Sequence, residues 1–102
     1  MATLHTVNKS PFMTQALMSC MNHAKDGDVI LMIEDGVYGG LAGTGLADAV
    51  AAKAGSLKIC VLTEDLEARG LDAGRLVAGV SAVGYDGFVD LVAETDRTQA
   101  WL

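Results

Sequence analysis

Val29-Ile30-Leu31-Met32-Ile33 is the stretch that decides the fold, and Glu34-Asp35-Gly36 follows it directly. Its five apolar residues include β-branched ones and do not alternate with polar residues, which is typical of a strand buried on both faces. Such strands lie at the centre of parallel sheets. Because ligands gather at the carboxyl ends of parallel strands, residues 34–45 are the first place to look for function.

The segments around this run predict an α/β architecture. Residues 3–7 and 58–62 are rich in strand-forming side chains, and residues 79–83 form a weaker strand candidate. Strands that alternate with helical segments predict a flavodoxin-like, mainly parallel sheet of about four or five strands, with helices on both faces. The length of 102 residues fits a single domain, residues 1–102.

The first helix is expected over residues 10–24. Ser10-Pro11 can start it, because serine accepts a hydrogen bond from a free amide and proline needs no partner for its missing N–H. An apolar stripe with helical spacing supports this helix. Its members are Met13, Ala16, Leu17, Cys20, Met21 and Ala24. Residues 46–54 and 66–69 predict a second helix and a helical turn.

A last helix is expected near the end of the chain, with Asp86 as its cap. Four apolar residues at helical spacing are expected to face inward. They are Tyr85, Phe88, Val89 and Val92. Asp90 and Glu94 continue the row begun by Asp86, and this acidic row is expected to face solvent.

Composition limits the classes of partner. Apolar residues make up 51% of the chain and the mean hydropathy is +0.35, which suggests excess apolar surface for a protein partner. No apolar run approaches the roughly 20 residues of a membrane span, and the N-terminus lacks a signal-peptide pattern, so we expect a cytoplasmic protein. The net charge of -6 disfavours direct binding to nucleic acid.

Ligand and metal sites receive little support from motifs. Glycines in residues 39–45 could bring backbone amides close to a phosphate, but the segment has no lysine and fits neither the Walker loop nor the dinucleotide fingerprint. A tight loop and no cofactor are therefore predicted. His5 and His23 lack ligands at a recognised metal spacing, so no metal site is predicted either.

Two acidic pairs follow predicted strands. Glu34 with Asp35, and Glu64 with Asp65, could act as acid/base pairs or as ligands for a hard cation. Carboxylates at the start of helical turns more often satisfy free amides, so capping is the favoured interpretation.

Cys20 is the candidate reactive residue. A thiol can carry sulfur as a persulfide, but only as an accessible thiolate. Its place on the apolar stripe predicts burial, and its place late in the helix raises the thiol pKa, with His23 as the only compensating group. From the residues alone, a buried structural cysteine is favoured. Cys60, within a buried strand, is predicted to be structural, and no disulfide is expected.

The chain resembles the DsrH/TusB family of sulfur-relay proteins, and DsrH most closely. The resemblance covers essentially the whole sequence. No single segment is specific to the family, but the segments together are. The segments that carry it are LHTVNKSPF (residues 4–12), IEDGVY (33–38), VLTEDLEARG (61–70), GFVDL (87–91) and QAWL (99–102).

The resemblance implies a DsrE/F-like fold and a cytoplasmic sulfurtransferase complex. In this heterohexamer, DsrE/TusD-like and DsrF/TusC-like subunits would be the partners, and persulfide sulfur would pass to a DsrC/TusE-like carrier. The main catalytic cysteine would lie in the DsrE/TusD-like partner, with Cys20 as an auxiliary site.

The resemblance also favours one branch of the family. Cys20 matches a cysteine of DsrH-type members from sulfur-oxidising bacteria that some TusB-type members lack, so dissimilatory sulfur oxidation is expected. The alternatives are a TusB-type relay for 2-thiolation of the tRNA wobble uridine, a non-catalytic scaffold subunit, and a flavodoxin-type binder of a small ligand.

Overall fold

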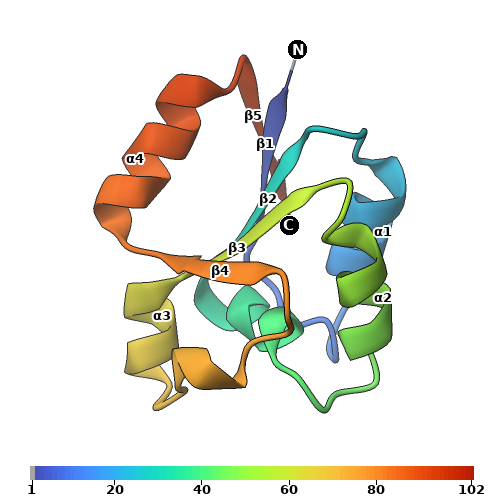
Figure 1. Ribbon diagram of the computed structural model, residues 1–102, viewed down its shortest axis with the longest axis vertical. Helices are drawn as coiled ribbons and strands as arrows, with labels where there is room; N and C mark the ends of the chain where they lie inside the picture. Colours follow the sequence, from blue (N-terminus) through green and yellow to red (C-terminus); the bar gives the residue numbers. More distant parts are fainter. Residues whose placement is uncertain (1) are drawn as a thin grey trace.

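Five parallel strands form one sheet in the computed structural model, which describes residues 2–102 (Figure 1). Their order is β4-β3-β2-β1-β5, so the apolar run that starts at Val29 is the central strand, as predicted. The strands are β1 (Thr3–Val7), β2 (Val29–Met32), β3 (Lys58–Leu62), β4 (Val80–Val83) and β5 (Arg97–Trp101). The predicted α/β class with a mainly parallel sheet is confirmed.

Helices cover both faces of the sheet, as Figure 1 shows. The first two α-helices lie on one face of the sheet, and the fourth lies on the other face. The third α-helix contributes Leu66 to the core of the first face. The helices are α1 (Ala16–His23), α2 (Ala47–Lys53), α3 (Thr63–Ala68) and α4 (Tyr85–Glu94), with the 3-10 helices η1 (Glu34–Gly40) and η2 (Ala73–Arg75).

Alternation along the buried strands divides the core between the two faces. In β2, Ile30 and Met32 pack with α1 and α2, whereas Leu31 packs with Leu91 of α4. In β1, Val7 faces α1 and Leu4 faces α4. The odd-numbered residues of β1 therefore point to the face that α1 covers. His5 is one of them, so a polar side chain also lies on this face.

The prediction for the start of the first helix was wrong. α1 begins at Ala16, and Met13, which was placed on its apolar stripe, is 83% exposed. Ser10 accepts hydrogen bonds within a turn instead, from the Phe12 amide to its Oγ and from the Met13 amide to its carbonyl. Serine side chains offer the backbone such local alternatives to a helix. Leu17, Cys20 and Met21 are buried as expected.

The predicted inward face of the last helix was wrong for three of its four residues, and Phe88 alone packs inward as expected. Tyr85 is 57% exposed and Val89 is 66% exposed, and Val92 is exposed too. Leu91 is the buried residue of α4, and Phe88 packs beside it. Asp86 does not cap the helix, because the N-cap position is Gly84. The helix carries a second apolar stripe, formed by Phe88 and Leu91, and this stripe meets the sheet.

The acidic row of α4 faces solvent as expected, since Asp86, Asp90 and Glu94 are all exposed. The residues after the helix form β5, an edge strand for which no residue range was predicted. Its side chains are mostly exposed and polar. Within residues 2–102, no helix is both long and apolar enough to cross a membrane.

Candidate functional site

The acidic turns at the carboxyl ends of the strands are tied together by hydrogen bonds. Asp65 Oδ2 accepts a hydrogen bond from the Glu34 amide at 2.7 Å, at the start of η1. Glu34 has a positive φ of 50°, a costly conformation for a residue with a side chain. Arg69 forms an ion pair with Asp35 of η1, with Nη2 2.9 Å from Oδ1. Asp65 therefore caps another element rather than its own helix.

Glu64 makes a similar crossed contact. Its Oε2 accepts from the amide of Tyr85, the first residue of α4, at 3.5 Å. The prediction that Glu64 and Asp65 cap their own helical turn was wrong, because no side-chain cap hydrogen bond forms at the start of α3. Each carboxylate instead accepts from an amide that is distant in sequence. Glu64 Oε1 and Asn8 Oδ1 are buried without a hydrogen-bond partner among residues 2–102, and such acceptors are suited to bound water.

The three glycines of η1 allow close packing. A Cβ on Gly36 would collide with the carbonyl oxygen of Val7. A Cβ on Gly39 would lie 2.5 Å from Leu17 Cδ2, and one on Gly40 would lie 2.8 Å from Val61 Cγ1. These glycines let η1 lie directly against the sheet and α1, so their presence is explained without a phosphate ligand.

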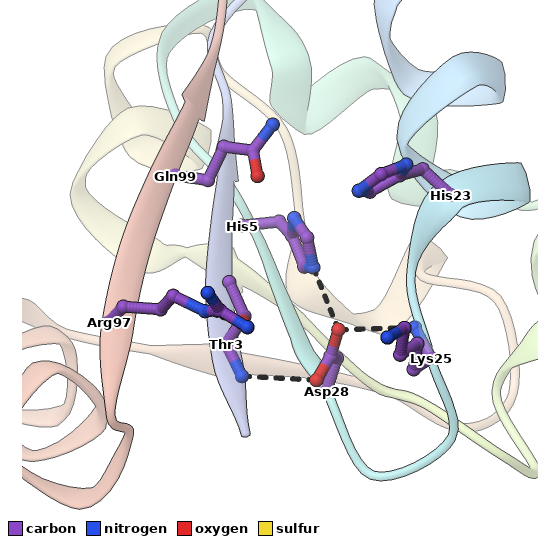
Figure 2. Close-up of a pocket in the computed structure, with 7 residues that line it drawn as sticks. All are labelled: Thr3, His5, His23, Lys25, Asp28, Arg97 and Gln99. Carbon is purple, nitrogen blue, oxygen red and sulfur yellow. Dashed lines mark hydrogen bonds and ion pairs between the residues drawn. The ribbon is translucent and has the colours of Figure 1, made fainter. Parts of the chain in front are cut away.

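A polar pocket lies at the opposite end of the sheet, where β1 and β5 begin (Figure 2). Its volume is about 330 Å³. Side chains reach it from β5 on one side and from the end of α1 and the following loop on the other, as Figure 2 shows. The residues that line it are Thr3, His5, His23, Lys25, Asp28, Arg97 and Gln99.

Asp28 anchors the floor of this pocket. It directly precedes β2 and is 5% exposed. Its Oδ1 accepts from the Thr3 amide at 3.0 Å, and its Oδ2 accepts from the Lys25 amide at 3.1 Å and lies 2.9 Å from His5 Nε2. Burial alone would raise the pKa of Asp28, but these hydrogen bonds and the interaction with His5 outweigh it and lower the pKa to about 2.

His5 is held as one tautomer. The indole Nε1 of Trp101 donates to His5 Nδ1 at 3.0 Å, so Nδ1 must carry the lone pair. The proton of the neutral ring is then on Nε2, which donates to Asp28. The ring is 2% exposed, and the rings of His23 and Trp101 lie beside it with centroids 6.4 and 6.1 Å away.

This arrangement limits the chemistry of the pocket. A His–Asp pair can act as a general base when one ring nitrogen is free to take a proton from a substrate. Both nitrogens of His5 are occupied, one by Asp28 and one by Trp101. The pair therefore supports structure and positioning, and the groups that remain free to meet a ligand are on Lys25, Arg97, His23 and Gln99.

Cys20 lies beneath the surface on α1, in the core shared with β2 and β3. It has no exposed area. Burial, and then the negative charge of Asp28, raise the pKa of the Cys20 thiol to about 12. In this conformation the thiol is protonated at neutral pH and out of reach of another protein. Cys60 is buried in β3 among residues on the α4 face, and burial raises its pKa too.

Sequence reasoning missed most of this pocket. His5 and His23 were considered as metal ligands, and His23 also as a group that could lower the pKa of the Cys20 thiol, but neither was placed in a pocket. Among residues 2–102 no group of three or more suitable side chains could hold a metal ion. Asp28 and Trp101 were not recognised as partners of His5. One signal was available, since a histidine inside a buried apolar strand needs hydrogen-bond partners.

Comparison with known proteins gives consistent matches along the chain. A sequence model of the family described as DsrH like protein matches residues 9–98. The Protein TusB of Erwinia tasmaniensis is 37% identical over 98 residues, which covers 96% of this chain and 99% of that protein. The Protein TusB of Sodalis glossinidius is 34% identical over the same shares of the two chains.

Solved structures agree at the level of the fold. The crystal structure of the ychN protein from E. coli superposes with a TM-score of 0.77 at 13% identity, over 98% of this chain and 99% of that one. A protein of unknown function from Methanobacterium thermoautotrophicum gives a TM-score of 0.67 at 18% identity, over 91% of each chain.

Proposed function

Because the chain belongs to the DsrH/TusB family, we propose that it is a subunit of a cytoplasmic sulfur-relay complex that passes persulfide sulfur to a DsrC/TusE-like carrier. The observation that carries the proposal is the family match, which extends over residues 9–98. The partners are DsrE/TusD-like and DsrF/TusC-like subunits of a heterohexamer. The apolar side chains that α4 exposes, Val89 and Val92 among them, favour a chain that works in contact with other proteins.

The role of Cys20 within this proposal depends on access. A persulfide forms on an accessible thiolate, whereas Cys20 is fully buried and its pKa is raised to about 12. This geometry favours a scaffold role, with the main sulfur-carrying cysteine on the DsrE/TusD-like partner. An auxiliary role for Cys20 requires that assembly or carrier binding move α1 and expose the thiol.

Two biological branches fit the family. The presence of Cys20 favours dissimilatory sulfur oxidation, while the relatives named Protein TusB favour the relay for tRNA wobble-uridine 2-thiolation. The genes beside this one discriminate between them: sulfite-reductase-type genes indicate oxidation, and tRNA-thiolation genes indicate the relay.

Intact-mass measurement of each subunit tests the proposal. The chain is co-purified with its two partner subunits, loaded with a persulfide donor and weighed, alongside Cys20→Ser and the matched control Cys60→Ser. We expect the DsrE/TusD-like subunit to gain the mass of sulfur. A gain on this chain that Cys20→Ser alone abolishes establishes the auxiliary role, and no gain on this chain makes Cys20 structural. If no subunit gains sulfur, the relay proposal is wrong.

A further inference from the structure

We propose that the pocket between β1, β5 and the end of α1 binds a small anion that presents two or more oxygen atoms, such as a tetrahedral oxyanion or a carboxylate. The proposal concerns a ligand of this chain and does not depend on the sulfur relay.

The first support is a pair of cations without counter-ions. Lys25 and Arg97 line the pocket from opposite sides, and neither forms an ion pair with a carboxylate in the described part of the chain. The chain has only seven Lys and Arg residues against thirteen Asp and Glu. In so acidic a protein, two unpaired cations facing one cavity provide a local site for negative charge.

Arg97 is also held in place. Its Nε donates to Thr3 Oγ1 at 3.0 Å, in keeping with the register that pairs Thr3 with Arg97 across β1 and β5. This contact fixes the plane of the guanidinium and leaves its two terminal nitrogens free. A fixed guanidinium is suited to oxygen atoms in a bidentate arrangement, which is how arginine binds carboxylates and phosphates.

Asp28, the acidic residue of the pocket, does not neutralise the charges that Lys25 and Arg97 offer to a ligand. Asp28 is 5% exposed, and its carboxylate already takes part in three hydrogen bonds, with Thr3, Lys25 and His5. Two of them come from backbone amides, so the ammonium group of Lys25 remains available. The carboxyl end of α1 adds partial negative charge, which places the preferred anion nearer to Arg97 than to the helix.

Two further polar side chains complete the site. The side chains of His23 and Gln99 point into the pocket in Figure 2, and among residues 2–102 neither has a hydrogen-bond partner. The volume of about 330 Å³ lies near the lower end of the range for ligand pockets, roughly 300–1,000 Å³. The pocket therefore fits a small molecule with several acceptors.

The single tryptophan of the chain allows a direct test. Trp101 contacts His5 through its indole N–H, so its fluorescence should change when the pocket is occupied. The full chain is titrated with sulfate, phosphate and succinate, with chloride at matched ionic strength as the reference. We expect saturable binding of at least one polyoxygen anion. Saturation by the inorganic anions alone identifies a tetrahedral oxyanion site, and saturation by succinate alone identifies a carboxylate site.

Variants locate the binding. Arg97→Gln and Lys25→Gln should each weaken binding about tenfold, because each removes a charge-assisted hydrogen bond, whereas Arg75→Gln and Lys9→Gln should leave binding unchanged. Circular dichroism and thermal unfolding verify that each variant is folded. The proposal is overturned if no anion saturates beyond the chloride reference, or if the control substitutions weaken binding as much as the pocket substitutions.

Discussion

The buried chain of hydrogen bonds from Trp101 through His5 to Asp28 joins three separate parts of the sequence. Each polar group in it has a partner, which is the condition for polar residues to be tolerated inside a fold. Removing one partner should therefore lower the free energy of unfolding more than a surface substitution would.

Asp28→Asn tests this expectation. The amide Nδ2 of asparagine would face donors where Asp28 presents an acceptor, so we expect the free energy of unfolding to fall by about 2–4 kcal/mol. Asp26→Asn is the matched control, because Asp26 is exposed and its side chain makes no hydrogen bond within residues 2–102. Urea denaturation measures both. Equal stability of the two variants would contradict the role given to Asp28.

The contribution of Asp28 to the free energy of unfolding should depend on pH. Folding lowers the pKa of Asp28 from its ordinary value of 3.8 to about 2. The folded state thus favours the ionised carboxylate, and its contribution is complete above pH 4–5 and lost as the pH falls towards about 2. The stability difference between the wild type and Asp28→Asn should shrink over that interval. A difference that stays constant from pH 5 to pH 2 would refute this assignment.

The two cysteines should be unreactive in the folded chain. Both are buried and burial raises the pKa of each, so a disulfide-type thiol reagent should react with them only as fast as the chain unfolds. The measurement is the rate of thiol titration with and without denaturant. Rapid native-state reaction of one thiol, absent in Cys20→Ala, would mean that α1 opens readily and would favour the auxiliary role of Cys20.

At the scale of elements, η1 lies directly against the carboxyl end of β1 at Gly36. Gly36→Ala would bring a Cβ against the Val7 carbonyl oxygen, and backbone atoms cannot turn aside as a side chain can. We expect a loss of about 1–3 kcal/mol or more in urea denaturation.

Gly45→Ala provides the control for this substitution. Gly45 has no neighbouring atom within 4 Å of an added Cβ, so the change in stability should be within about 1 kcal/mol. If the two alanine variants were equally stable, η1 would not lie as close to β1 as described.

Elements differ in how much of them the sequence could predict. β2 and β3 were predictable because continuous apolar runs require burial on both faces. β5 has no such run, since an edge strand with exposed side chains leaves no apolar pattern. The orientation of α4 was missed because the helix carries two apolar stripes, and only packing against the sheet selects the one with Leu91.

At the scale of the whole molecule, the fold class could be predicted and the candidate pocket could not. The pocket depends on the pairing of β5 with β1, which brings residues more than ninety positions apart into contact, as in the bond from Arg97 to Thr3. Local patterns carry no information on that pairing. The sequence directed attention to the carboxyl ends of the strands, whereas the pocket lies at their amino ends.

Sulfur transfer to the carrier tests the proposal that this chain is a working subunit of a sulfur relay. The complex of the DsrE/TusD-like and DsrF/TusC-like subunits is loaded with a persulfide donor, with or without this chain, and the DsrC/TusE-like carrier is then weighed. We expect the carrier to gain the mass of sulfur when this chain is present and to gain little when it is absent. Equal loading of the carrier in both cases, or no loading in either, would contradict it.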